Sequence, residues 1–324
     1  MRKCYSVCDF LSEENKRQMI AVAGECGFEI DFFESNEEAA GKVSDAEVIY
    51  CVDAALFEEM QDLRWAHSAF AGVGQFIGSG SFNSEKTLLT NSSGAYGLAI
   101  SEHVIMVTLM LMRRMPDYLE IINKHEWKQD LRVRSVAGST MAIIGTGDVG
   151  MNAAKRYKAL GAKKVAGFSR SGRQREPFDE VYRIDDFDRV MGSGLADEID
   201  VLLLCVPGTS ETEGLLSADR IALLSEKTFV INVGRGVVID QDALIDALNE
   251  GRIAGAALDV VYPEPLPADH PLWNAKNCII TPHSSGDMAL KYTVDITVDI
   301  FCENIRRYVS GKELTHLVDI KAGY

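Results

Sequence analysis

The sequence is short of positive charge: 33 Lys and Arg stand against 48 Asp and Glu, giving a formal net charge of −15. An acidic chain is repelled by nucleic acid and by anionic membrane surfaces, so we expect neither as a partner. A long hydrophobic run is missing as well. The most apolar stretch, residues 98–112, is interrupted by polar residues and is too short to span a bilayer. Residues 1–16 contain no sustained apolar segment, which argues against a secretory signal.

Cysteine is scarce and scattered. The seven cysteines show no C-x-x-C spacing, and their number is odd, so the sequence indicates neither a disulfide framework nor a zinc site. Most of them lie inside apolar runs, where a buried free thiol is expected. We therefore expect no metal ion, and we expect the protein to act in the reducing cytoplasm.

The chain does contain two series of alternating strand-like and helix-like segments. This rhythm predicts parallel sheets covered by helices on both faces, hence an α/β fold with two doubly wound sheets. A long apolar helix over 98–114, stopped by Pro116, suits burial between two domains, and a last helix over 288–309 ends before Gly311. The expected strands are 3–8, 28–33, 47–52 and 64–70 in the first series and 139–145, 163–169, 199–207, 228–234, 254–260 and 277–282 in the second, with a helix over 13–26.

A glycine-rich turn opens the second series. In "MAIIGTGDVGMNAAKRYKALG", Gly145, Gly147 and Gly150 form G-x-G-x-x-G directly after a β-branched strand and at the start of a helix. The first glycine permits the tight turn, the second lets a pyrophosphate approach the backbone, and the third lets helix and strand pack closely. Amides at the helix amino terminus then meet the phosphate charge. The turn predicts a dinucleotide site.

The next strand ends in "GFSRSGR", where an NAD-binding sequence would place an acidic residue on the ribose 2′-hydroxyl. Ser169 and Arg170 stand there instead, followed by Ser171 and Arg173. Residues 149–175 hold eight Lys or Arg and no Asp or Glu. Lys and Arg on the intervening helix fit a solvated face, but Arg170 and Arg173 lie where a guanidinium can bind a 2′-phosphate. We expect NADP as the cofactor, with NAD as the alternative.

Three candidate catalytic groups follow later strands. Arg235 sits between two glycines in "VINVGRGVVID", Glu264 between two prolines in "DVVYPEPLP", and His283 after a proline in "IITPHSSG". Each has a plainer interpretation as a surface charge or a structural histidine. Together, a carboxylate that stabilises a protonated imidazole and an arginine that binds an anion suggest a dehydrogenase acting on a carboxylic acid.

At these motifs the chain resembles the D-isomer-specific 2-hydroxyacid dehydrogenase family, over nearly its whole length. The matching segments are "TNSSGAYGLAISEHV", "AIIGTGDVG", "VINVGRGVVID", "ALDVVYPEPLP" and "HPLWNAKNCIITPHSSG". The resemblance implies a Rossmann cofactor domain, residues 101–284, inserted in a flavodoxin-like substrate domain, residues 1–100 and 285–324. It also implies a homodimer.

The resemblance further implies roles for single residues. Arg235 would bind and polarise a 2-oxo acid, His283 would be the acid/base, and Glu264 its partner. Asp259 would lie near the nicotinamide carboxamide. The segment "FAGVG", with Ala71, Gly72 and Val73, would bind the substrate carboxylate. The expected cofactor contacts are Gly145, Thr146, Gly147, Asp148, Val149, Gly150, Ser169, Arg170, Ser171, Arg173, Val206, Pro207, Val233, Gly234, Asp259, Ser285 and Gly286.

Departures from the family pattern refine the expectation. Ser169–Arg170 in place of an acid resembles the NADP-preferring glyoxylate/hydroxypyruvate reductase branch, and "HSSG" predicts altered substrate contacts at Ser284 and Ser285. We expect NADPH-dependent reduction of a small 2-oxo acid to a D-2-hydroxy acid. Alternatives are a nicotinamide-sensing, corepressor-like binding protein and an NAD-dependent dehydrogenase for a bulkier acid. Formate oxidation, another chemistry of this fold, is disfavoured by Glu264.

Overall fold

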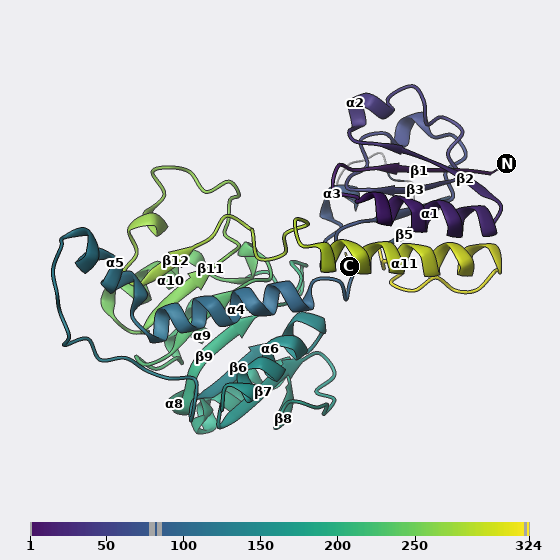
Figure 1. Ribbon diagram of the computed structural model, residues 1–324. Coiled ribbons are helices and arrows are strands. Elements are labelled where there is room, and N and C mark those ends of the chain that lie inside the picture. The colour runs from purple at the N-terminus through teal and green to yellow at the C-terminus, as the bar shows by residue number, and fades with distance from the viewer. Residues whose placement is uncertain (1, 78–81, 83–85, 321–322, 324) are drawn as a thin grey trace. The chain divides into compact units, whose positions relative to one another are not determined.

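A computed structural model describes residues 2–77, 82, 86–320 and 323. The chain divides into two compact units (Figure 1): Met1–Tyr96 with Asp287–Tyr324, and Gly97–Gly286. The boundaries expected from the sequence were 100/101 and 284/285. Each unit is described by itself below.

The first unit is built on a parallel five-stranded sheet with the order β2-β1-β3-β4-β5. This is the strand order of flavodoxin-like folds. Buried apolar side chains cover both faces of the sheet, as expected for parallel strands between helices. The strands are β1 Arg2–Val7, β2 Phe28–Phe33, β3 Val48–Cys51, β4 Trp65–Ser68 and β5 Leu88–Thr90.

Two long helices of this unit lie side by side although they are far apart in the sequence (Figure 1). Helix α1 (Glu13–Glu25) begins at a capping box made by Ser12 and Asn15. The Asn15 amide also donates to Asp295 of α11 (Lys291–Val309) at 2.9 Å. The carboxyl-terminal helix thereby belongs to the amino-terminal unit. The remaining helical segments are α2 Asn36–Ala39, α3 Gly74–Ile77 and a 3-10 turn at Phe57–Glu59.

The second unit contains a parallel seven-stranded sheet with the order β12-β11-β10-β9-β6-β7-β8. The order reverses between β6 and β9, and ligands of such open sheets bind beyond the carboxyl ends of the strands near that point. The predicted fold class, two doubly wound parallel sheets, is confirmed. The strands are β6 Thr140–Ile144, β7 Lys164–Ser169, β8 Glu180–Arg183, β9 Ile199–Leu204, β10 Phe229–Asn232, β11 Gly255–Leu258 and β12 Cys278–Ile280.

Helices α4 (Gly97–Met112) and α6 (Asp148–Ala159) pack against each other on one face of this sheet. The hydroxyls of Thr108 and Tyr157 form a buried hydrogen bond of 2.8 Å between them. The other helical segments are α5 Met115–Asn123, α7 Phe187–Val190, α8 Ala196–Glu198, α9 Ala218–Ala222 and α10 Gln241–Glu250, with short 3-10 turns at Ile184–Asp186, Gly236–Val238 and Pro271–Asn274 and a π-turn at Met191–Leu195.

Two strands of the structure have no counterpart among the strands expected from the sequence. Strands β5 and β8 were not predicted, because one has three residues and the other is the polar edge strand "EVYR". Within its own unit, the apolar helix α4 exposes Met106 and Leu109. In the described part of the chain, no helix combines the length and apolarity needed to cross a membrane.

Candidate active site

Three neighbouring strands place the predicted catalytic residues at one edge of the seven-stranded sheet. Arg235 follows β10, Glu264 lies in the loop after β11, and His283 follows β12. The Nδ1 atom of His283 lies 2.8 Å from Oε2 of Glu264. The contact arises because the carboxyl ends of adjacent parallel strands lie at the same edge of a sheet.

Hydrogen bonds of Val261 and Tyr262 fix the loop that carries Glu264. Oε1 of Glu264 accepts the backbone amide of Val261 at 3.0 Å, which leaves Oε2 for His283. The side-chain amide of Gln241 clamps Tyr262 by donating to its carbonyl at 2.8 Å and accepting its amide at 3.2 Å. The carboxylate is therefore held in place before any ligand binds.

Arg235 is held by the strand end that precedes it. The side chain of Asn232 accepts the amide of Gly234 at 3.0 Å and donates to the carbonyl of Arg235 at 2.9 Å. Gly236 allows close approach to the Glu264 loop, since a Cβ there would lie 2.0 Å from the carbonyl oxygen of Val261. Burial lowers the pKa of the Arg235 guanidinium, and the charge of Glu264 partly offsets this. A poorly solvated guanidinium is suited to binding an anion.

The backbone of His283 is itself unusual, with a φ of 53° in the left-handed region that non-glycine residues rarely occupy. The carboxylate of Asp259 organises this loop: it accepts the hydroxyl of Thr281 at 2.6 Å and the amides of Ser284 and Ser285 at 2.9 and 3.1 Å. Burial raises the pKa of Asp259, but these hydrogen bonds and that of the Ser285 hydroxyl outweigh it and hold the pKa below its usual value.

The glycine-rich turn has room for a phosphate. A Cβ on Gly150 would lie 1.9 Å from the carbonyl oxygen of Gly145, so this glycine serves the packing of helix on strand. A Cβ on Gly147 would meet nothing within 4 Å. Gly147 is also the amino-terminal cap of α6 and offers no side chain to the first amides of the helix. The open side of the turn and these amides fit a pyrophosphate.

Two other residues of the turn use their side chains inside the protein. The Asp148 carboxylate accepts the Asn152 amide at 2.9 Å and is packed against the backbone of Gly97, and burial raises its pKa. Thr146 is buried, and its methyl group faces Gly167 of β7.

The basic loop after β7 is a compact turn. The Ser169 hydroxyl accepts the amide of Gly172 at 3.1 Å, and that of Ser171 accepts the amide of Arg173 at 3.2 Å. A serine that accepts one amide can still donate its own hydrogen. Arg170 and Arg173 are both exposed. The loop thus carries two guanidiniums beside a hydroxyl donor, at the end of the strand next to the glycine-rich turn.

The remaining predicted contacts lie at other strand ends. A Cβ on Gly234 would lie 2.4 Å from the carbonyl oxygen of Val206, so these two backbones touch where β9 and β10 end, next to Pro207 and Val233. Ser285 is buried and Gly286 is half-buried beside it. In the five-stranded unit, the carbonyls of Ala71 and Gly72 accept side-chain amides of Asn91 and Gln75 at 2.9 and 3.2 Å, just before Val73.

Three further residues of the site were not identified from the sequence. Gln241 clamps the Glu264 loop, as described above. Arg175 donates to the carbonyl of Thr146 at 2.6 Å and so ties the basic loop to the glycine-rich turn. His103 of α4 lies 3.3 Å from the hydroxyl of Thr281. Among the residues described, no three His, Cys, Asp or Glu side chains are grouped so that they could hold a metal ion.

Comparison with known proteins identifies relatives of this chain. Residues 105–285 match the family described as "D-isomer specific 2-hydroxyacid dehydrogenase, NAD binding domain". The hydroxypyruvate reductase of Blautia hydrogenotrophica is 29% identical over 290 residues, which are 85% of this chain and 86% of that protein.

Two solved structures are similar over the whole chain. A D-isomer specific 2-hydroxyacid dehydrogenase family protein from Aeromonas salmonicida aligns with a TM-score of 0.84 and 31% identity, covering 99% of this chain and 100% of the other. An NADPH-dependent glyoxylate/hydroxypyruvate reductase from Sinorhizobium meliloti, in complex with NADP and sulfate, aligns with a TM-score of 0.82 and 28% identity and covers 100% of both chains.

Proposed function

Because this chain belongs to the D-isomer-specific 2-hydroxyacid dehydrogenase family, we propose that it reduces a small 2-oxo acid, such as glyoxylate or hydroxypyruvate, with NADPH. The product is a D-2-hydroxy acid. The observation that carries the proposal is the 2.8 Å contact between Nδ1 of His283 and Oε2 of Glu264, at the same sheet edge as a partly buried arginine. Relatives named hydroxypyruvate reductase and glyoxylate/hydroxypyruvate reductase support the substrate class.

His283 supplies the proton in this proposal. With Nδ1 bound to the carboxylate, Nε2 is the nitrogen that can face a substrate, and the carboxylate fixes the orientation of the ring. A bound nicotinamide supplies the hydride that reduces the substrate C2. As charge develops on the substrate oxygen, His283 donates its proton there and Glu264 stays hydrogen-bonded to the resulting neutral ring.

Arg235 orients the acid. Its Nη1 atom donates to the carbonyl of Gly234 at 2.7 Å, which leaves other N–H groups of the guanidinium for the carboxylate and the 2-oxo oxygen of a substrate. A preorganised cation next to a developing negative charge typically contributes several kcal/mol to catalysis. In the five-stranded unit we propose that the backbone of Ala71, Gly72 and Val73 binds the substrate carboxylate, since side chains already hold two of its carbonyls.

Ser169, Arg170 and Arg173 are the residues we propose for the 2′-phosphate of NADPH. The glycine-rich turn offers the pyrophosphate an open side and helix amides that no side chain caps. The carboxylate of Asp148 lies against Gly97. The S. meliloti structure, which contains NADP, supports this cofactor. Asp259 is proposed to lie near the nicotinamide, as are the segments at Val206 and Val233.

A substrate and cofactor panel tests the function. Initial rates are measured with glyoxylate, hydroxypyruvate, pyruvate and a bulky branched 2-oxo acid, each with NADPH and with NADH. We expect the highest kcat/KM for a small acid with NADPH, and we expect His283→Ala to abolish turnover while NADPH still binds. Binding of NADPH without turnover of any acid would instead favour a corepressor-like sensor.

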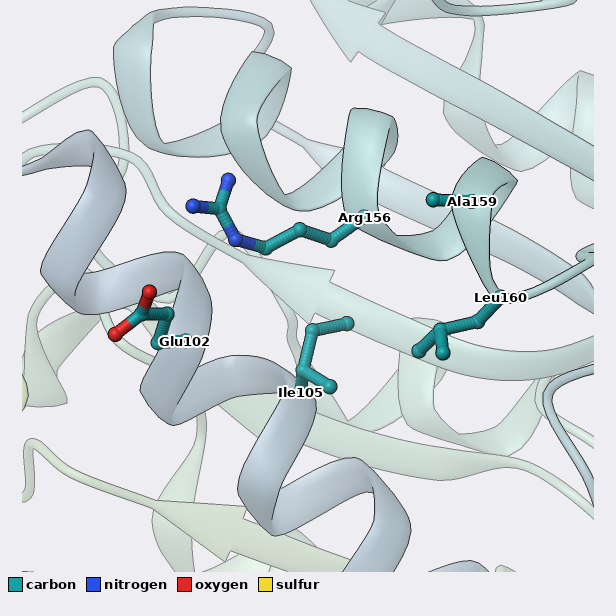
Figure 2. A pocket seen from close by; sticks show the side chains of 5 residues that line it. All are labelled: Glu102, Ile105, Arg156, Ala159 and Leu160. Carbon is teal, nitrogen blue, oxygen red and sulfur yellow. The ribbon is translucent and has the colours of Figure 1, made fainter.

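We also propose that the protein is a homodimer in a reducing compartment, where its seven cysteines, all free, stay reduced. The outer face of α4 exposes Met106 and Leu109, and Trp127 beyond α5 is 89% exposed. Helix α4 also borders an open groove beside α6, seen in Figure 2. Glu102 and Ile105 of α4, Arg156 and Ala159 of α6, and Leu160 at the carboxyl-terminal cap of α6 line this groove.

Burial of such an apolar face is the usual drive for a second copy to bind. Light scattering should give twice the chain mass, and Met106→Glu should give the mass of a single chain. A monomeric wild-type protein would contradict the dimer.

A further inference from the structure

A chain of hydrogen bonds runs from helix α4 to the loop that carries His283. Nε2 of His103 lies 3.3 Å from Oγ1 of Thr281, and that oxygen lies 2.6 Å from Oδ1 of Asp259. His103 is a titratable side chain for which the proposed chemistry has no use. Its ring is mostly buried, with a side-chain exposure of 11%, and it lies 3.9 Å from the same carboxylate oxygen.

The hydrogens available on His103 and Thr281 determine which group donates in each of these two hydrogen bonds. The pKa of Asp259 is below its usual value because its hydrogen bonds outweigh its burial, so the carboxylate is ionised and can only accept. The single hydroxyl hydrogen of Thr281 therefore points to Asp259. Thr281 is then the acceptor for His103, whose Nε2 must carry a hydrogen. Burial lowers the pKa of His103 more than the charge of Asp259 raises it, which leaves a neutral ring with the hydrogen on Nε2.

Asp259 in turn binds the backbone around His283. Its side-chain oxygens accept the amides of Ser284 and Ser285, and its backbone carbonyl accepts the amide of His283 at 2.8 Å. Three successive amides thus bind one aspartate, and the first belongs to the residue with the left-handed φ of 53°. A rotation of the carboxylate would release the two amides that follow His283 and loosen this conformation.

We propose that His103 is a positioning residue for His283: its Nε2–H group holds Thr281, and Thr281 holds the Asp259 carboxylate in the orientation that fixes the His283 loop. This inference rests on the proposed function, which makes His283 the acid. Hydrogen bonds that follow one another in a series strengthen each other. Loss of the bond between His103 and Thr281 therefore weakens the bonds from Asp259 to the His283 loop. A shift of an ångström at a catalytic group is enough to slow a reaction substantially.

Four substitutions, two at His103 and two at Thr281, separate this role from simple packing. His103→Gln places an amide N–H near the position of Nε2 and can donate to Thr281, whereas His103→Asn ends near Nδ1 and cannot reach it. Thr281→Val removes the middle hydroxyl at nearly constant volume, and Thr281→Ser keeps it. The proposal predicts two impaired variants, Asn and Val, and two that resemble the wild type, Gln and Ser.

The first measurement is kcat and KM with glyoxylate and NADPH. His103→Asn and Thr281→Val should lower kcat roughly tenfold, because His283 is less well placed, while KM for NADPH changes less than about twofold. His103→Gln and Thr281→Ser should restore kcat. If His103→Asn turns over at the wild-type rate, or if His103→Gln is as slow as His103→Asn, the inference is wrong.

The second measurement does not depend on turnover. Hydrogen–deuterium exchange of the cofactor-free protein should be faster at residues 283–286 in the Asn and Val variants, and unchanged in the Gln and Ser variants. Strand β9 serves as the internal control and should exchange at the same rate throughout. Equally fast exchange at β9 would mark His103 as a packing residue and overturn the inference. If no 2-oxo acid is reduced, the proposed function fails, but the exchange pattern still decides the role of His103.

Discussion

The side chain of Glu264 joins two parts of the site: Oε2 lies 2.8 Å from Nδ1 of His283, and Oε1 accepts the amide of Val261 at 3.0 Å. Both oxygens therefore act as acceptors. An amide in this position has only one acceptor oxygen, so it must present its NH₂ group either to the Val261 amide, which is itself a donor, or to His283. Neither arrangement reproduces the charged carboxylate that binds both the Val261 amide and His283.

Glu264→Gln should therefore lower kcat/KM about 100-fold, in the range typical for loss of acid–base catalysis. The affinity for NADPH should not change, because Glu264 lies outside the glycine-rich turn. The exposed Glu226 offers a matched control. Steady-state kinetics and cofactor titration check both expectations, and a Glu264→Gln enzyme as active as Glu226→Gln would refute the role of the pair.

Local sequence signals predicted most of the second sheet, because β9 and β10 are largely apolar and the glycine-rich turn lies directly after β6. They failed for β8, whose edge position allows polar residues that do not distinguish a strand from a loop. A single sequence also contains no signal for contacts between distant residues. His103 and Thr281 are separated by 178 positions, and their hydrogen bond exists only because α4 packs on this sheet.

The site shows the same limit. Arg235, Glu264 and His283 could be proposed because glycine and proline flank them, but the sequence did not reveal what holds them. "HSSG" suggested altered substrate contacts at Ser284 and Ser285, but it gave no signal that the backbone and hydroxyl of Ser285 bind Asp259.

Gly147 and Gly150 should respond differently to the same substitution. A Cβ on Gly150 would lie 1.9 Å from the carbonyl of Gly145, so Gly150→Ala should destabilise the protein by about 1–3 kcal/mol or more through overpacking. A Cβ on Gly147 meets open space at a φ of −75°. Gly147→Ala should keep the wild-type melting temperature but weaken NADPH binding, since the methyl group occupies the side open to the pyrophosphate. Thermal unfolding and fluorescence titration distinguish the two, and tight NADPH binding by Gly147→Ala would argue against the proposed phosphate position.

The two exposed arginines of the basic loop should set the cofactor preference. Arg170→Ala and Arg173→Ala should each lower kcat/KM for NADPH roughly tenfold, because each removes charge-assisted hydrogen bonds to the 2′-phosphate. Rates with NADH should change little, since NADH has no such phosphate. Lys163→Ala, an exposed residue of the same basic stretch, is the control for a general loss of positive charge. Equal losses with both cofactors would show that the loop does not recognise the 2′-phosphate.

His67 should make the stability of the protein sensitive to mild acid. The ring is fully buried on β4, with Nδ1 2.7 Å from the Thr90 hydroxyl and Nε2 3.2 Å from that of Ser92. Burial, assisted by the charge of His316, lowers the pKa of His67 to about 3. The folded state therefore keeps the ring neutral while the unfolded state binds a proton below its ordinary pKa of about 6.5.

The stabilising contribution of neutral His67 is complete above pH 6.5 and falls by about 1.4 kcal/mol per pH unit below it, until the folded-state pKa is reached. Between pH 7.5 and 5.0 the free energy of unfolding should drop by about 2 kcal/mol more in the wild type than in His67→Gln. The glutamine side chain of this variant does not titrate in this range. Urea unfolding at the two pH values measures the difference, and subtracting the variant removes the shared contribution of the other titrating groups. Parallel pH dependence in the two proteins would mean that His67 does not remain neutral in the folded state.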